Sequence, residues 1–166
     1  GGNVFEGNTI YNALKQHKAK VTVTVDGVAA SIASVIAMAG DHVRMPENAM
    51  MMIHDPLGIV VGNSAAMRKQ AEALDKIKQS IVSAYMTRTT EDRSKIESMM
   101  SRETWLTAEE AVEIGFADEV MKDVGAQNFA FDILSQYRNI PTQVLAMLGS
   151  ENKPQLKKEP KMEITL

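Results

Sequence analysis

The chain has 166 residues, of which 45% are hydrophobic and 23% are charged, so it can bury a core as an ordinary globular domain does. Its formal net charge of −3 gives no reason to expect nucleic acid or an anionic membrane as a partner. No apolar run reaches the roughly 18 residues of a membrane span, and the absence of cysteine excludes disulfides and thiolate catalysis. Because the first residues lack the basic and then apolar pattern of a signal peptide, we expect a soluble, cytoplasmic protein.

The first part of the chain predicts short strands and helices in alternation. Valine and threonine alternate in "VTVTV", which is typical of a strand, and the apolar stretch after it is typical of a buried helix that ends at Gly40. The segment "GIVVG" is bracketed by glycines and is compatible with another strand. The expected elements of this part are a helix over 6–17, a strand over 21–25, a helix over 31–39 and strands over 42–45, 49–53 and 58–62.

The second part predicts helices with clear start and stop signals. Residues 64–88 form the longest helical pattern, with apolar residues three and four positions apart and charged residues between them. Thr90, Glu91 and Asp92 are typical of a cap, so a further helix is expected from there through about Met100. Thr107 followed by Glu110 has the spacing of a capping box, and Gly115 marks the helix end. The alternation of strands and helices indicates an α/β fold.

The composition changes after Gly125, which divides the chain into three expected parts. These are a main domain over 1–125, a short helical extension over 126–149 and a flexible charged tail over 150–166. The extension has two apolar stretches separated at Pro141, and the tail is polar, rich in lysine and interrupted by proline.

Ser31 stands where the strand pattern gives way to the buried helix, and two interpretations of it are open. Serine is a preferred helix cap, so Ser31 can simply cap this helix. It can also be a nucleophile, because the N–H groups at a helix start favour developing negative charge. The small residues Gly27, Ala29 and Ala30 before it would let a substrate backbone approach.

An activated serine needs a base, and the chain has three histidines. His17 is expected on the surface and His42 at the start of a strand. His54 follows an apolar strand at a position where α/β folds place reactive groups, so it is the candidate base, and a hydrogen-bonded structural histidine is the alternative. His54 and Asp55 have no metal-ligand spacing, so we expect no zinc site and no cofactor.

Three motifs in the same order resemble the proteolytic subunit of Clp protease (ClpP) and its relatives. The chain has "GVAASIAS", then "MMMIHDPLG", then "SRETWLTAEEAVEIGFAD". The family has G-x-A-A-S-M-G/A, then M-I-H-Q-P, then an acidic residue shortly before F-L-S/T-A-x-E-A-x-x-x-G-x-x-D. The resemblance covers Gly1 to about Val120. It implies the α/β fold of ClpP and crotonase, with repeated β-β-α units and a protruding long handle helix, and the activity of a serine endopeptidase.

Carried over residue by residue, the resemblance implies a catalytic triad of Ser31 as nucleophile, His54 as base and Glu103 as the residue that orients the base. The family usually has aspartate at the third position, but a glutamate can also accept the histidine N–H. Asp92 is an alternative orienting residue, although it matches no motif. The other alternative for Glu103 is a solvated charge in a loop.

The resemblance also implies backbone sites around the triad. The oxyanion donors fall on the N–H groups of Gly2 and Ile32, and the substrate peptide is expected to bind as an added strand near Leu57 and Gly58. The helix over 64–88 resembles the handle that joins two rings of the family face to face. We therefore expect a ring-forming homo-oligomer that acts on polypeptides.

Two departures from the family determine the expected role. The chain opens at Gly1-Gly2, which the family reaches only after further elements that carry part of the unfoldase docking surface, so a partner AAA+ unfoldase is left open. The segment over 126–166 resembles the phage or prophage branch, whose members are head maturation (prohead) proteases. Our main expectation is an enzyme of that branch, with capsid or scaffold precursors as partners and the host cytoplasm or prohead as its location.

Three alternatives stay open at this point. One is the proteolytic subunit of an ATP-dependent Clp protease that works with an unfoldase. Another is a catalytically silent, ring-forming scaffold protein, which a glutamate at position 103 allows. The last is an acyl-CoA enzyme on the related crotonase fold, which would need neither Ser31 nor His54.

Overall fold

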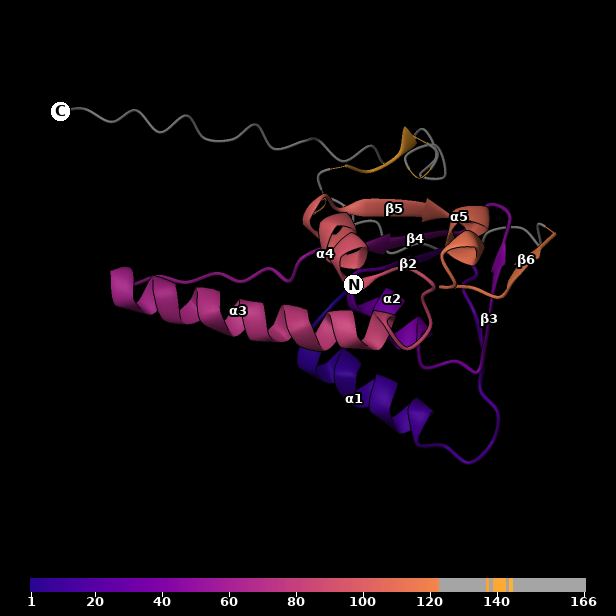
Figure 1. Cartoon of the computed structure of the whole chain (residues 1–166), viewed down its shortest axis with the longest axis horizontal. Helices are drawn as coiled ribbons and strands as arrows, with labels where there is room; N and C mark the ends of the chain where they lie inside the picture. The colour runs from indigo at the N-terminus through magenta and orange to yellow at the C-terminus, as the bar shows by residue number, and fades with distance from the viewer. Residues whose placement is uncertain (123–136, 138, 143, 145–166) are drawn as a thin grey trace, which may run out of the picture. The chain divides into compact units, whose positions relative to one another are not determined.

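Two three-stranded sheets form the framework of the residues that the structure describes, which are 1–122, 137, 139–142 and 144 of a computed structural model (Figure 1). The described residues up to 122 belong to one structural unit, and those beyond 128 belong to a second. The elements of the first unit are α1 (Val4–Lys15), β1 (Thr22–Thr24), β2 (Val28–Ala30), α2 (Ile32–Ala37), β3 (His42–Pro46), β4 (Met50–Ile53), α3 (Ser64–Tyr85), α4 (Arg93–Ser101), β5 (Thr104–Thr107), α5 (Ala108–Glu113) and β6 (Glu119–Met121).

The first four strands alternate between the two sheets as the chain proceeds. In one sheet β3 lies between β1 and β6 and pairs with both in parallel, and in the other β2 pairs in parallel with β4. The segments β1-β2-α2 and β3-β4-α3 are therefore two copies of one β-β-α unit, each of which gives one strand to each sheet. β5 completes the second sheet by pairing antiparallel to β4. The predicted α/β fold of repeated β-β-α units is confirmed.

β4 is the central strand of the sheet β2-β4-β5, and all four of its residues are buried. A strand that is covered on both faces needs an unbroken apolar run, and "MMMI" supplies one. The short helix α2 packs against β2 and β4 and also against α1 and α3, so it connects this sheet to both longer helices. Each buried Met, Val or Ile side chain contributes on the order of 1.5–3 kcal/mol. The residues beside β4 and α2 are thus attached to buried elements of the core.

α3 is the longest helix of the described unit and extends well beyond the sheets (Figure 1). Asn63 caps it, because the Asn63 side chain accepts the N–H of Ala66. Burial is confined to its C-terminal part, at Ile81, Val82 and Tyr85. The predicted long helix is therefore confirmed, and its N-terminal part protrudes as a handle does.

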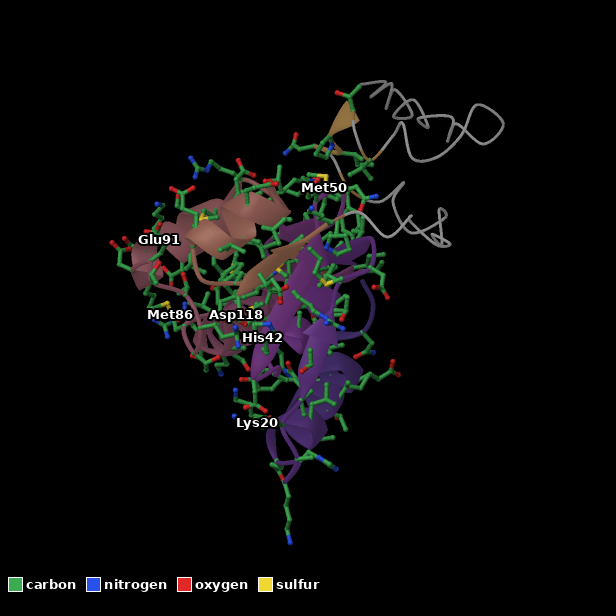
Figure 2. The ribbon with its side chains drawn as sticks, turned by 90° about the vertical axis from the view of Figure 1, so that its right-hand side faces the viewer. Lys20, His42, Met50, Met86, Glu91 and Asp118 are labelled. Carbon is green, nitrogen blue, oxygen red and sulfur yellow. The ribbon has the colours of Figure 1, made fainter. Side chains whose placement is uncertain are left out.

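An ion-pair cluster ties the end of α3 to β3 and to the segment before β6. The Arg88 guanidinium pairs with Asp118, whose carboxylate also accepts the Val43 N–H at 2.6 Å. A second Arg88 nitrogen donates to the Gly40 carbonyl at 2.6 Å. His42 begins β3, as predicted, and lies beside Asp118 with its Nδ1 3.7 Å from the carboxylate (Figure 2). His42 thus belongs to this structural cluster.

The predicted helix signals agree with the observed helix ends. Asp92 caps α4 by accepting the Lys95 N–H, and Thr107 and Glu110 form the predicted capping box at the start of α5. Gly115 follows α5 with a φ of 81°, a left-handed conformation that glycine adopts without strain. Short-range polar signals therefore predicted where these helices begin and end.

Residues 58–62 do not form a strand, so the interpretation of this segment as one was wrong. The segment packs along α3, where a Cβ added to Gly58 would come within 2.6 Å of the side-chain nitrogen of Gln70. The side chains of Ile59 and Val61 are 96% and 94% exposed, so the apolar residues that suggested a strand face solvent. In contrast, β2, β5 and β6 were not predicted, because their segments "VAA", "TWLT" and "EVM" show neither the alternation around β1 nor the apolar run of β4.

The C-terminal part of the chain lies largely outside the described residues. The predicted extension over 126–149 is described only at residues 137, 139–142 and 144, and the predicted tail over 150–166 lies outside the described residues altogether. The division into these three parts therefore stays a prediction. Of the helices that the structure describes, none is both long and apolar enough to cross a membrane.

Gly7 lets α1 lie directly against α2, because a Cβ added to it would come within 2.0 Å of Ile32 Cγ1. We predict that Gly7→Ala lowers the free energy of unfolding by about 1–3 kcal/mol, because the overpacking outweighs a gain in helix propensity of roughly 1 kcal/mol. Urea unfolding followed by circular dichroism measures the change. Asn12→Ala, at an exposed position of α1, is the control and should change stability by less than about 0.5 kcal/mol. A Gly7→Ala variant as stable as the wild type would contradict this docking contact.

Candidate active site

The ends of neighbouring strands meet at one edge of the sheet β2-β4-β5. In the parallel pair, Ala30 is level with Met52, and the Ser31 N–H extends the pairing by donating to the Met52 carbonyl at 2.9 Å. Ser31 directly follows β2, and His54 directly follows Ile53, the last residue of β4. The register of this pair therefore brings Ser31 and His54 to the same edge.

β5 brings the third predicted residue to this edge from the other side of β4. The antiparallel register pairs Ile53 with Thr104, so Glu103, which precedes Thr104, stands opposite His54 when the ladder is continued by one residue. Glu103 has a φ of 51°, a left-handed conformation that is uncommon for a residue with a side chain. The Glu103 N–H donates to the Met100 carbonyl at 3.0 Å. This tight turn leads the chain from α4 into β5 beside the imidazole.

Ser31 precedes α2 but does not act as its side-chain cap. The side chain makes no capping hydrogen bond to the helix, and its Oγ instead lies 2.8 Å from His54 Nε2. The backbone of Ser31 has φ 60° and ψ −129°, a strained conformation that costs about 1–3 kcal/mol. A strained turn between a strand and a helix presents a serine hydroxyl at the edge of a sheet. Of the two interpretations of Ser31, the geometry therefore excludes the simple cap.

The surroundings of His54 favour a neutral imidazole near pH 7. Burial lowers the pKa of His54 below its usual 6.5, and the negative charges of Glu103 and Asp55 offset part of that effect. In a neutral ring with Nδ1 protonated, Nε2 has the lone pair that can accept the Ser31 hydroxyl proton. The Ser31–His54 pair thus has the distance and the protonation state that proton transfer from serine requires.

Glu103 acts on His54 through its charge. Of the two carboxylates that raise the pKa of His54, Glu103 has the larger effect. Glu103 is half-buried, and its Oε1 accepts a long hydrogen bond of 3.4 Å from Trp105 Nε1, so it is not a solvated loop charge. Asp92, the alternative orienting residue, caps α4. The structure therefore brings Ser31, His54 and Glu103 together.

A polar cluster that the sequence did not reveal fixes the turn after His54. Asp55 pairs with Lys78 of α3, whose Nζ lies 2.8 Å from Asp55 Oδ1, and accepts the Ser101 hydroxyl of α4 at 3.1 Å. The Asp55 N–H donates to the Met100 carbonyl at 3.1 Å. The residue next to His54 is thus held against two helices. No local signal could have found this cluster, because its members come from distant parts of the chain.

Gly2 and Ile32, whose N–H groups were predicted to bind an oxyanion, lie near each other. A Cβ added to Gly2 would lie 3.9 Å from Ile32 Cγ2, because the Gly7 contact brings the start of α1 close to α2. Ile32 is the first residue of α2, so its N–H has no acceptor within that helix. Gly2 thus lies near the residue that follows Ser31, and the role of the two N–H groups in binding an oxyanion stays a prediction.

Leu57 and Gly58, which were predicted to bind the substrate peptide, lie in the segment between His54 and α3. The Leu57 side chain is 71% exposed, and Gly58 lies against α3. The structure places this apolar segment directly after the turn that carries His54. Its role in peptide binding stays a prediction.

A hydroxyl, an imidazole and a carboxylate are the chemical groups that this edge presents. In the part of the chain that the structure describes, no three or more histidine, aspartate or glutamate side chains come together as a possible metal site. Acyl transfer uses the same three types of group, as nucleophile, base and orienting residue.

Comparison with known proteins agrees with this arrangement. Residues 1–124 match the family described as Clp protease. The chain belongs to the Clp protease family. The predicted resemblance to this family is thereby confirmed.

Relatives in this family include subunits from bacteria and an alga. The chain is 32% identical over 125 residues to the ATP-dependent Clp protease proteolytic subunit 1 of Protochlamydia amoebophila, an alignment that covers 73% of this chain and 61% of the relative. It is 30% identical over 125 residues to the protein of the same name from Salinibacter ruber, covering 74% and 54%. It is 32% identical over 126 residues to the ATP-dependent Clp protease proteolytic subunit of Chlorella vulgaris, covering 74% and 62%. The chain thus spans between 54% and 62% of the length of these relatives.

We predict that His54 titrates below pH 6.5 and that Glu103→Gln lowers its pKa further, because the substitution removes a negative charge that raises it. An NMR titration of the imidazole signals, assigned with His54→Ala, measures both values. Glu103→Asp keeps the charge and should shift the pKa less than Glu103→Gln does. Glu113→Gln removes an exposed charge at the end of α5 and should leave it unchanged. An unchanged pKa in Glu103→Gln would contradict an action of this carboxylate on the imidazole.

Proposed function

We propose that the protein is a serine endopeptidase of the Clp protease type, with Ser31 as nucleophile, His54 as general base and Glu103 as the residue that orients the base. The observation that carries this proposal is the 2.8 Å distance between Ser31 Oγ and His54 Nε2. The effect of Glu103 on the pKa of His54 supports the third role. Membership of the Clp protease family supports the reaction class.

Acylation begins when His54 Nε2 takes the proton of Ser31 Oγ and the oxygen attacks the carbonyl carbon of a peptide bond. Glu103 stabilises the imidazolium that forms. The N–H groups of Gly2 and Ile32 donate to the oxyanion of the tetrahedral intermediate. The intermediate collapses as the C–N bond breaks, and His54 gives its proton to the leaving amine. Ser31 then carries the acyl group as an ester.

Deacylation repeats these proton transfers with water as the nucleophile. His54 takes a proton from the water while the water oxygen attacks the ester carbonyl. His54 then gives this proton to Ser31 Oγ as the bond between the acyl carbon and Ser31 Oγ breaks. Both half-reactions need a neutral imidazole at their start. The lowered pKa of His54 supplies that form at neutral pH.

A polypeptide in an extended conformation is the proposed substrate. The segment around Leu57 and Gly58 belongs to no sheet in the described part of the chain, so its backbone can pair with a peptide as an added strand. Its sequence position directly after the His54 turn supports delivery of the scissile bond to Ser31. Exposed apolar side chains along the segment would contact the side chains of the peptide.

A ring-forming homo-oligomer is the proposed assembly, with α3 as a contact between rings. The protrusion of α3 and the exposure of Met67 on it support this arrangement. The relatives' names support the role of an ATP-dependent Clp protease proteolytic subunit, and for that role a partner unfoldase is proposed. Head maturation of a phage has only the resemblance of residues 126–166 in its favour. Degradation that requires an AAA+ unfoldase and ATP would support the first role, and cleavage of capsid precursors without them would support the second.

Two other functions have less support from the geometry. A silent scaffold protein would need neither the strained backbone of Ser31 nor the pairing of the Ser31 hydroxyl with the His54 imidazole. An acyl-CoA enzyme on this fold would leave the Ser31–His54 pair without a role.

We predict that a fluorophosphonate probe labels the full chain on Ser31 alone, because only a serine with a base at hydrogen-bond distance is activated for attack. Peptide mapping by mass spectrometry identifies the labelled residue. His54→Ala should slow labelling at least about 10³-fold, in line with losses seen when a member of such a triad is removed. His17→Ala replaces an exposed histidine and serves as the control, with labelling unchanged. Equal labelling of the wild type and His54→Ala would contradict the proposed base, and the absence of label on Ser31 would contradict the proposed nucleophile.

A further inference from the structure

Two buried hydroxyl groups connect α3 to the Ser31 turn. Ser34 of α2 is 0% exposed and Tyr85 at the end of α3 is 1% exposed. Ser34 Oγ lies 2.5 Å from the carbonyl oxygen of Ser31 and 2.8 Å from the Tyr85 hydroxyl. Buried hydroxyl groups are costly unless they are hydrogen-bonded, and here the two hydroxyl groups pair with each other and the Ser34 hydroxyl also bonds to the Ser31 carbonyl.

The chemistry of these groups fixes the direction of both hydrogen bonds. A carbonyl oxygen can only accept, so the Ser34 hydroxyl uses its one proton to donate to Ser31. Tyr85 must then donate its own proton to Ser34 Oγ. Burial raises the pKa of Tyr85 above its usual 10, so the phenol keeps this proton at neutral pH. Donation therefore runs in one direction, from Tyr85 to Ser34 and from Ser34 to Ser31.

The Ser31 carbonyl shares a rigid peptide plane with the Ile32 N–H. The peptide bond between them is trans, so the carbonyl and the N–H point in opposite directions within that plane. Two donors from Ser34 hold the carbonyl, because the Ser34 N–H also donates to it, at 3.0 Å. Any contact that fixes the carbonyl oxygen consequently fixes the direction of the Ile32 N–H.

These contacts also explain how the strained backbone of Ser31 is maintained. On one side of Ser31, its N–H donates to the Met52 carbonyl of β4 at 2.9 Å, which holds the preceding peptide plane. On the other side, Ser34 holds the following plane. Tyr85 is itself fixed by stacking on Phe116, with ring centroids 5.0 Å apart. With both planes held, φ and ψ of Ser31 cannot relax to an unstrained turn.

We propose, on the basis of the serine endopeptidase function above, that Ser34 and Tyr85 are positioning residues that direct the Ile32 N–H toward the oxyanion. Neither side chain contacts the substrate. Their hydroxyl groups act through the peptide plane between Ser31 and Ile32. Because the oxyanion forms only during the reaction, their removal affects kcat and not the binding of the substrate.

The test measures hydrolysis of a fluorogenic peptide by the full chain. Ser34→Ala should lower kcat about 10- to 100-fold and leave KM within about twofold, less than the 10²- to 10³-fold loss on deleting an oxyanion donor. Tyr85→Phe should lower kcat less, because Ser34 still donates to Ser31. The affinity for a peptide aldehyde, whose adduct carries the oxyanion, should fall by the same factor as kcat/KM. The pH midpoint of kcat/KM should stay unchanged, because His54 is not altered.

Two comparisons separate positioning from simple stability. Ser34→Ala leaves the Tyr85 hydroxyl buried without its partner, whereas the double variant Ser34→Ala/Tyr85→Phe removes both groups and should regain much of the lost melting temperature. We expect kcat to stay low in the double variant. Thr87→Val removes an exposed hydroxyl that donates to the Ala84 carbonyl at 2.7 Å near the same helix end, and it should leave kcat unchanged.

Each remaining outcome has a distinct meaning. Recovery of kcat together with the melting temperature in the double variant would overturn the positioning role, because stability alone would then account for the loss. A Ser34→Ala variant with kcat within twofold of the wild type would overturn it as well, provided that Ser31→Ala abolishes hydrolysis. Hydrolysis that survives in Ser31→Ala would instead overturn the proposed function itself.

Discussion

The position of β4 between β2 and β5 is the constraint on which the site depends. β4 pairs in parallel with β2 and antiparallel with β5, so the C-terminal ends of β2 and β4 lie at the same edge as the N-terminal end of β5. Ser31, His54 and Glu103 are the residues directly beyond those three ends. A slip of one residue in either register would move one of these side chains to the opposite face of the sheet. The core that buries "MMMI" is therefore also what holds the three groups in line.

The site is held by contacts that lie outside it. Ser31 has an unfavourable backbone conformation, and it keeps this conformation because β4 holds its N–H and Ser34 holds its carbonyl. The turn after His54 is fixed in a similar way by Asp55, which reaches α3 and α4. α3 thus contacts the neighbourhood of both Ser31 and His54, through Tyr85 at one point and Lys78 at another. Geometry at the edge of the sheet depends on this helix as well as on the strands.

The sequence predicted the parts of this structure that depend on local signals. The capping box at Thr107, the cap at Asp92 and the amphipathic pattern of α3 each correspond to an observed helix. Ser31 was found because a recognisable helical pattern begins at it, and His54 because it follows a recognisable strand. The family motifs added Glu103. The conclusion that the hydroxyl of Ser31 does not cap α2 came only from the structure.

Contacts between distant parts of the chain could not be predicted in this way. The short strands β2, β5 and β6 form because neighbouring strands pair with them, and their own segments have neither an alternating nor a continuous apolar pattern that shows this in advance. The Ser34–Tyr85 pair joins residues 51 positions apart, and each residue taken alone fits an ordinary helix. The apolar residues at 58–62 gave a strand-like pattern, but the segment lies along α3 and has no partner strand in the described chain.

A crystal structure of the full chain with a peptide boronate would test the central claim most directly, because a boronate forms a tetrahedral adduct with an activated serine. We expect a covalent bond from boron to Ser31 Oγ, with one boronate oxygen at about 2.7–3.1 Å from the backbone nitrogens of Gly2 and Ile32. His54 Nε2 should remain within hydrogen-bond distance of Ser31 Oγ or of the second boronate oxygen. A boronate that bonds to another residue, or an adduct on Ser31 whose oxygens lie away from both nitrogens, would contradict the account.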